Sequence, residues 1–339
     1  MSVPRLLPAL RLLVLVAALF LIGPFAPPAL RSPSRVDGAA MILFKPVALD
    51  SRDPARTKLG ALTFLGGWSL DSPNRGFGGI SALHVGDGAV VALSDAGALI
   101  RFPLPRGTSV RGRIDPLPVG MAPPVAKRDR DSESMALYGG HAWIGFEWRG
   151  AIWRYATASG DSAGWRSDAH HAPAAMRAWP NNSGAEGIVR LKDGRFLVFS
   201  EGAMRKDGTS EVLEFSGDPA LGGTPARSLG YRAPDGYRLT DAALLPDGGL
   251  LLLNRRFALL EGVSAKLVVA RPPRPGVPAI IAGNTIADFA APVTVDNMEA
   301  LSVIREQGRT IVWIASDDNF SPLQRTLLLK FALDEQAGG

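Results

Sequence analysis

From residue 57 onward the chain is built from short apolar runs separated by glycine, proline, aspartate and asparagine. The runs are too short for amphipathic helices, and no extended pattern with a period of 3.6 residues follows the N-terminal region. Short apolar runs bounded by turn-forming residues are typical of strands. This part of the chain is therefore predicted to be all-β.

The apolar runs recur with an internal period. Five segments begin alike, and their starts are 55, 53, 55 and 58 residues apart, at Gly78, Glu133, Glu186, Asp241 and Glu299. A turn follows each start, and then a second strand is predicted over 90–94, 142–146, 196–200, 250–253 and 311–315. Third strands are predicted over 98–102, 151–155, 211–215 and 326–331.

A period near 55 residues that holds about four strands is typical of propeller blades. The pattern therefore predicts a single β-propeller of five four-stranded blades. The last repeat has room for three strands, so segment 59–65 is expected to supply the fourth and to pair the N-terminal with the C-terminal strands. A sixth blade is the alternative if 59–70 is more than a closing strand. A β-sandwich also has frequent short strands, but it lacks a period of this length.

The N-terminal region reads as a targeting segment. Arg5 and Arg11 precede an apolar run over residues 12–22, which has the length of a signal-peptide core and is short for a membrane span. We predict a signal peptide or an uncleaved membrane anchor over 1–30, a linker over 31–56 and the folded domain over 57–335. Either reading of the leader predicts an exported protein, periplasmic or extracellular.

Composition excludes several classes of function. The chain has no cysteine, which rules out disulfides, thiolate metal sites and cysteine nucleophiles. The net charge is +5, but residues 1–40 hold four arginines against one aspartate, so the remainder carries only +2. No run of lysine and arginine with interleaved aromatic residues is present, so nucleic acid is not an expected partner. A monomer is expected.

Two apparent motifs are weak evidence for a catalytic or metal site. Gly160, Ser162 and Gly164 match the G-x-S-x-G pattern of a nucleophile elbow, but the stretch is polar and no helical pattern follows it. The four histidines do not have the spacing of a metal site.

Charged residues recur at one position of the repeats. The start of strand one and the end of strand two lie at the same edge of a hairpin, and in a propeller this edge surrounds the mouth of the central channel. The strand-one starts supply Glu133, Glu186, Asp241 and Glu299. The strand-two ends supply Asp95, Glu147, Glu201, Arg255 and Asp317, with Asp131, Asn254, Arg256, Asp318 and Asn319 beside them.

So many carboxylates at short range raise one another's pKa and need compensation. A hard divalent cation such as Ca²⁺ is one solution, and its predicted ligands are Asp95, Glu133, Glu147, Glu201 and Asp241. Pairing with Arg255 and Arg256 is a second, and these arginines are also predicted to bind substrate. Protonation of one or two carboxylates, which then act as general acids, is a third. Some of these carboxylates are also expected to cap backbone N–H groups in turns.

Three stretches resemble the family described as esterase-like activity of phytase. They are 186–188 (EGI), 296–302 (DNMEALS) and 316–320 (SDDNF) followed by 324–326 (QRT), and the resemblance extends from about residue 59 to 333. The chain departs from the family pattern in its second and fourth repeats, which read Glu133-Ser134-Met135 and Asp241-Ala242-Ala243, and it has Arg255 at an acidic position.

The resemblance implies an exported β-propeller that hydrolyses phosphate or other esters. The matched positions imply catalytic roles for Glu186, Glu299, Asp317 and Asp318 and substrate-binding roles for Asn319 and Arg325. With Arg255 and Arg256 in the same mouth, the expected substrate is a small anionic ester. A metal-dependent lactonase and a non-catalytic propeller that binds a ligand or a protein are the alternatives.

Overall fold

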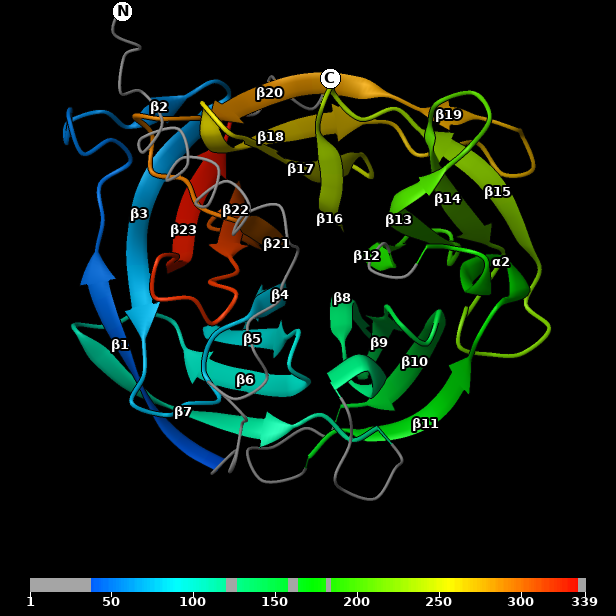
Figure 1. The fold of residues 1–339 in the computed structure, drawn as a ribbon, viewed down its shortest axis with the longest axis horizontal. Helices are drawn as coiled ribbons and strands as arrows, with labels where there is room; N and C mark the ends of the chain where they lie inside the picture. Colours follow the sequence, from blue (N-terminus) through cyan, green and yellow to red (C-terminus); the bar gives the residue numbers. More distant parts are fainter. Residues whose placement is uncertain (1–37, 120–126, 158–163, 181–183, 335–339) are drawn as a thin grey trace, which may run out of the picture.

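The computed structural model describes residues 38–119, 127–157, 164–180 and 184–334. The described chain is all-β, and its strands are arranged in a ring when viewed along the shortest axis (Figure 1). Two short helical segments interrupt the strands, η1 (Lys127–Asp129) and α2 (Ala174–Arg177). Within these ranges no helix has the length and hydropathy that a membrane span requires. The predicted leader lies outside the described residues.

Five inner strands surround the centre of the ring. Each contacts the next in a closed circle, in the order β4, β8, β12, β16, β21 and back to β4. They span Ile80–Gly86 (β4), Ser132–Tyr138 (β8), Ala185–Arg190 (β12), Arg238–Leu244 (β16) and Met298–Glu306 (β21).

Each inner strand begins an antiparallel meander that runs outward. The second strands are β5 (Ala89–Ser94), β9 (His141–Phe146), β13 (Phe196–Met204), β17 (Leu250–Ala258) and β22 (Arg309–Ser316). The third strands are β6 (Ala98–Pro103), β10 (Ala151–Ala156), β14 (Ser210–Phe215), β18 (Gly262–Ala270) and β23 (Thr326–Leu333). Every second and third strand that the repeats predicted is confirmed, with the ends shifted by a few residues.

The outer strands complete the meanders. They are β7 (Ser109–Pro116), β11 (Arg166–His171), β15 (Ala226–Tyr231), β20 (Gly283–Phe289) and β3 (Leu62–Asp71), and β19 (Ile280–Ile281) adds to β15 in parallel. β3 pairs with β23 over eight residues, and the short β2 (Lys58–Leu59) pairs with β3. The predicted pairing of the N-terminal and C-terminal strands is therefore present.

The first described strand lies inside the stretch that was predicted to be a linker. β1 (Gly38–Pro46) pairs with β3 on one side and with β7 on the other, and so joins two meanders into one ten-stranded sheet. Ala40, Ile42 and Phe44 are buried in the core between these strands. The linker prediction does not hold for residues 38–46, because the alternate side chains of this strand are core residues.

The cores lie between neighbouring meanders. Strands β16, β17, β18 and β20 share one cluster with β21–β23, in which Leu253, Leu267 and Phe289 pack with Ile314 and Phe331. Equivalent clusters fill the spaces between the other sheets. The inner strands are therefore held rigidly, which fixes the positions of the side chains at their first residues.

Candidate functional site

All five inner strands carry a β-bulge at the same place. The register shifts between residues 80 and 82, 132 and 134, 185 and 187, 239 and 241, and 298 and 300. The bulged residues are therefore Ser81, Glu133, Glu186, Thr240 and Glu299. A bulge re-aims a side chain at the end of a strand, and bulges are frequent beside active sites.

The strand that follows contributes a second position at the same edge. In four meanders, a backbone N–H group at this position donates to the carbonyl group just before the inner strand, over 2.8–3.4 Å. The donor and acceptor pairs are Asp95 and Gly79, Glu147 and Asp131, Glu201 and Gly184, and Asp317 and Asn297. These acceptors each precede the bulge by two residues. In the fourth meander the corresponding pair is Arg238 and Arg255, which are partners in the ladder between β16 and β17.

We call these three positions of one meander a sector and the five sectors together the rim site. Sector one has Gly79, Ser81 and Asp95; sector two has Asp131, Glu133 and Glu147; sector three has Gly184, Glu186 and Glu201; sector four has Arg238, Thr240 and Arg255; sector five has Asn297, Glu299 and Asp317. Sector two thus has three carboxylates, whereas sector four has two arginines and no carboxylate. The rim site is electrostatically asymmetric.

Sector two is where a cation fits best. Asp131, Glu133 and Glu147 each offer a carboxylate oxygen, and these three atoms lie within 4.8 Å of one another. Burial raises the pKa of Glu133 well above its ordinary value, and the neighbouring charges of Asp131, Glu186, Asp95 and Glu147 raise it further. Several oxygen ligands with excess negative charge are what Ca²⁺ requires. Two of these residues, Glu133 and Glu147, were predicted as metal ligands, and Asp131 as their neighbour.

Sector four supplies the cations of the rim site. The Nε of Arg255 lies 3.1 Å from Oε1 of Glu299, and its Nη2 lies 3.4 Å from Oε1 of Glu201. Burial lowers the pKa of Arg255, but the carboxylates of Glu299, Glu201, Glu186 and Asp317 outweigh it, so the guanidinium remains charged. Arg238 lies 3.9 Å from the other oxygen of Glu201 and was not predicted from the sequence.

Three further carboxylates of the rim site have pKa values that are raised chiefly by burial. Burial raises the pKa of Glu299 to about 7 against the partial compensation of Arg255. Burial also raises the pKa of Glu186, together with the charges of Glu201, Glu147 and Glu299. For Asp317, burial and then the charge of Asp95 raise the pKa. Groups whose pKa is shifted toward neutrality by burial and neighbouring charge are typical of catalytic sites.

The remaining predicted residues of the 316–325 stretch make hydrogen bonds and an ion pair beside the rim site. Oδ1 of Asp318 accepts hydrogen bonds from the N–H of Gly79 and of Phe320, both 2.9 Å long. Asn319 is exposed, and its N–H donates to Oδ1 of Asp317 over 2.6 Å. Arg325 is paired with Asp296, with Nε 3.3 Å from Oδ2. These contacts place Asp318 between sectors five and one, while Arg325 lies outside the cluster of raised pKa values.

Arg256 is not brought to the rim site. Neighbouring residues of a strand point to opposite faces, and Arg256 pairs with Glu261 and lies over the ring of Tyr237, 5.7 Å from its centroid. Its predicted substrate role stays a prediction that this geometry does not support.

Asp241 occupies a different position from the one that the repeats suggested. The register places Thr240 at the bulge and Asp241 one residue later, and a shift of one residue sends a side chain to the opposite face. Asp241 is buried, and its two oxygens accept the N–H groups of Ala242 and of Leu301, each over 2.7 Å. It therefore joins β16 to β21 and is not gathered with the other predicted metal ligands. Gly78 is likewise replaced by Ser81 as the sector-one equivalent.

We expect Asp241→Ala to destabilise the fold by roughly 2–4 kcal/mol, because two buried backbone donors lose their acceptor. Asp241→Asn, which retains one acceptor, should lie between this variant and the parent. Chemical denaturation measures the loss, and Asp53→Ala, at an exposed aspartate, serves as the control. Equal stability of Asp241→Ala and Asp53→Ala would show that the carboxylate does not join the strands.

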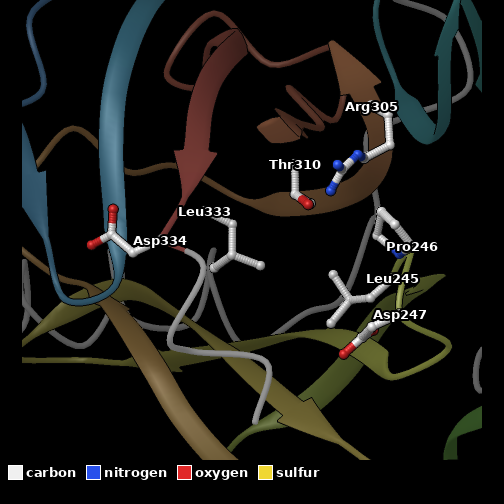
Figure 2. A pocket seen from close by; sticks show the side chains of 7 residues that line it. All are labelled: Leu245, Pro246, Asp247, Arg305, Thr310, Leu333 and Asp334. Atoms are coloured by element: carbon white, nitrogen blue, oxygen red, sulfur yellow. The ribbon is translucent and has the colours of Figure 1, made fainter. Parts of the chain in front are cut away.

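The rim at the other end of the inner strands has a cleft of about 240 Å³. Its lining residues are Leu245, Pro246, Asp247, Arg305, Thr310, Leu333 and Asp334. Figure 2 shows Leu245, Arg305 and Leu333 around it, from the ends of β16, β21 and β23. None of the predicted site residues lies there. The G-x-S-x-G stretch can be placed on neither rim, because residues 158–163 lie outside the described residues.

The comparison with protein families decides the assignment. The family model described as "Phytase-like: Esterase-like activity of phytase" matches residues 75–320, which is most of the chain. The chain belongs to this phytase-like family. The match spans all five sectors of the rim site of this phytase-like protein, so the family membership that the sequence resemblance implied is confirmed.

Among solved structures, the phytase-like protein is similar to three hydrolase or cyclase structures at low identity. An endo-arabinase from Bacteroides thetaiotaomicron has 12% identity, with 75% of this chain and 93% of that chain covered and a TM-score of 0.48. An α-L-arabinanase from Cellvibrio cellulosa has 11% identity, coverage of 75% and 92%, and a TM-score of 0.45. A glutaminyl cyclase from Myxococcus xanthus has 10% identity, coverage of 76% and 90%, and a TM-score of 0.42. No curated protein sequence matches the chain.

Proposed function

We propose that this phytase-like protein is an exported, monomeric hydrolase of phosphate or other anionic esters and that the rim site is its active site. The five sectors support a propeller of five blades, since β3 completes the fifth meander and is not a sixth blade. One observation carries the functional proposal: three carboxylates in sector two and two arginines in sector four lie on the same rim. A site that has a cation position and separate fixed cations suits an anionic ester.

Arg255 and Arg238 would bind the anionic group of the ester. A guanidinium binds carboxylate and phosphate oxygens through two parallel hydrogen bonds, and Arg255 is already oriented by Glu201 and Glu299. Such a preoriented cation stabilises the charge that develops in the transition state.

Sector two would hold the divalent cation, for which Ca²⁺ is the best candidate given three carboxylates and no nitrogen or sulfur ligand. Bound there, Ca²⁺ would polarise the ester and neutralise part of the excess negative charge. Asp95 of the adjoining sector one is close enough for its charge to raise the pKa of Glu133, whereas Glu201 of sector three is paired with Arg255.

Glu299 would supply the proton for the leaving group. With a pKa of about 7, it is partly protonated at neutral pH and is suited to general acid catalysis. In the reaction, water oxygen forms the new bond to phosphorus or to the acyl carbon, and the water proton passes to the carboxylate of Glu201, which is paired with Arg255 and Arg238. The bond to the leaving alcohol breaks as Glu299 gives that oxygen its proton.

The proposal is tested with the purified chain and three chromogenic substrates: an aryl phosphate, an aryl acyl ester and a lactone. We expect turnover of the phosphate or the acyl ester, loss of most activity on chelation, and recovery with Ca²⁺. Turnover of the lactone alone would show a lactonase. No turnover of any of the three, with Ca²⁺ present, would favour a binding protein.

Glu133→Gln is expected to weaken Ca²⁺ binding at least about tenfold, because one charged ligand becomes neutral. Titration calorimetry with Ca²⁺ measures this directly, without reference to activity. Glu261→Gln is the matched control, since Glu261 is exposed and pairs with Arg256 away from the rim site. Unchanged Ca²⁺ affinity in Glu133→Gln would place the cation elsewhere or remove it from the proposal.

A further inference from the structure

A cavity opens beside sectors three and four. It measures about 650 Å³ and lies between the β13–β14 hairpin and the segment that connects β15 to β16. We call it the side cavity, and the lining residues that bear on its chemistry are Glu201, Met204, Arg232, Pro234, Tyr237 and Arg238.

The side cavity is continuous with the rim site. Glu201 of sector three and Arg238 of sector four line both, and Arg255 contacts the other carboxylate oxygen of the same glutamate. A molecule whose charged group is held at sector four therefore has the side cavity as the adjoining space for its remaining atoms.

One wall of the cavity is apolar and accessible. Met204, at the end of β13, is 64% exposed, although it is a large hydrophobic residue at the cavity margin. The hydroxyl of Tyr237 is hydrogen-bonded to Ser264 Oγ over 2.9 Å, so its polar atom is already occupied. With Pro234, these residues offer carbon surface and not hydrogen-bonding groups.

The charged groups of the cavity differ in how far they are already neutralised. Asp207 accepts the N–H and the hydroxyl of Thr209, at 3.1 and 2.5 Å, and Glu201 is paired with Arg255. Asp235 is exposed and lies in the middle of the lining segment 231–238. In contrast, the Arg238 side chain is 65% exposed with its nearest carboxylate oxygen 3.9 Å away, and Arg232 has no ion pair within the described part of the chain. Among the described residues, Arg238, Arg232 and Asp235 are thus the charged groups of the cavity without a close ion pair, and the two arginines give this set a net positive charge.

We propose that the side cavity binds the organic part of the substrate and selects an amphipathic anion, an aryl or alkyl group attached to a phosphate or carboxylate. Arg232 joins Arg238 and Arg255 in binding the anionic group, and Met204, Pro234 and Tyr237 contact the apolar group. The inference builds on the proposed function by naming its substrate class: esters with an apolar substituent, and not esters of a heavily hydroxylated polyol.

Calorimetric titration with decyl phosphate, below the concentration at which it forms micelles, tests this against inorganic phosphate. We expect decyl phosphate to bind at least tenfold more tightly than inorganic phosphate. Met204→Ser should reduce the affinity for decyl phosphate several-fold and leave inorganic phosphate unaffected, whereas Arg238→Gln should weaken both. Because Met204 and Arg238 are exposed, both variants are expected to fold, which circular dichroism checks.

Leu323→Ser is the control, an 81% exposed residue on the β22–β23 connection outside the side cavity. Equal affinity for the two phosphates, equal loss in Leu323→Ser and Met204→Ser, or preference for decyltrimethylammonium would overturn the proposal. The outcome is independent of catalysis. Tight binding of decyl phosphate without any ester hydrolysis would contradict the proposed function and leave the role of the side cavity standing. Hydrolysis of a small aryl phosphate without preferential binding of decyl phosphate would contradict only the role of the side cavity.

Discussion

Replacing Arg255 with methionine is expected to lower kcat/KM for an anionic ester by a factor of about 100 to 1,000. Methionine preserves much of the packing of the arginine stem and removes the guanidinium. The substrate anion then loses its oriented partner, and Glu299 and Glu201 lose the cation that lies 3.1 and 3.4 Å from them. The loss of that cation also raises the pKa of Glu299 above its present value.

Arg305→Met provides the comparison for this variant. Arg305 is exposed to solvent and lies on the opposite rim, beside the cleft of about 240 Å³ (Figure 2). We expect its kcat/KM to stay within about twofold of the parent, as is usual for surface substitutions away from a site. If Arg255→Met lowers the hydrolysis of a neutral acyl ester as much as that of an aryl phosphate, Arg255 does not act by binding the anion.

The strands were predictable from the sequence because their signal is local. Apolar runs bounded by turn residues placed the five second strands and four of the five third strands near their observed positions, and the 55-residue period made these positions equivalent. β1 was missed because Met41 and Leu43 are apolar although they are 42% and 38% exposed. Their presence hides the alternation of Ala40, Ile42 and Phe44 that marks a half-buried strand.

The bulged position of the rim site was predicted correctly in three repeats, one residue late in sector four and three residues early in sector one. A bulge adds one residue to a strand, and no local feature of the sequence tells which of two neighbours is bulged. In sectors two, three and five the glutamate is that residue, so the prediction of Glu133, Glu186 and Glu299 as equivalents agrees with the register. In sector four an aspartate follows the bulged Thr240, and similarity of charge pointed to Asp241.

The alternation of side chains along a strand helps to predict which arginines reach the rim site. Arg255 and Arg256 are adjacent in sequence, and the alternation of side chains along a strand was sufficient to separate them. Arg238 was missed because the repeats were aligned on carboxylates. An alignment on the residue two positions before each bulge relates it to Asp131 and Asn297, and so would have found it. Long-range pairing distances, such as those between Arg255 and Glu299, have no counterpart in the local sequence.

Replacing Glu299 with glutamine is expected to lower kcat about 100-fold to 10,000-fold, the range for loss of a general acid. The parent should lose activity as the pH rises through about 7, because the active form of Glu299 is the protonated one. Glutamine carries no such proton, so the remaining activity should lack this alkaline limb. Steady-state kinetics across the pH range measure both effects.

Glu299→Gln is also expected to make the stability of the fold less dependent on pH. The pKa of Glu299 is raised from 4.5 to about 7 by burial, so the folded state binds the proton more tightly than the unfolded chain. Its contribution to stability is complete below pH 4.5 and is lost as the pH rises through 7. Without added metal, the Tm of the parent should therefore fall between about pH 5 and about pH 8, and Glu299→Gln should fall less. An unchanged alkaline limb in Glu299→Gln, with the same dependence of Tm on pH as the parent, would assign the proton to another carboxylate of the rim site.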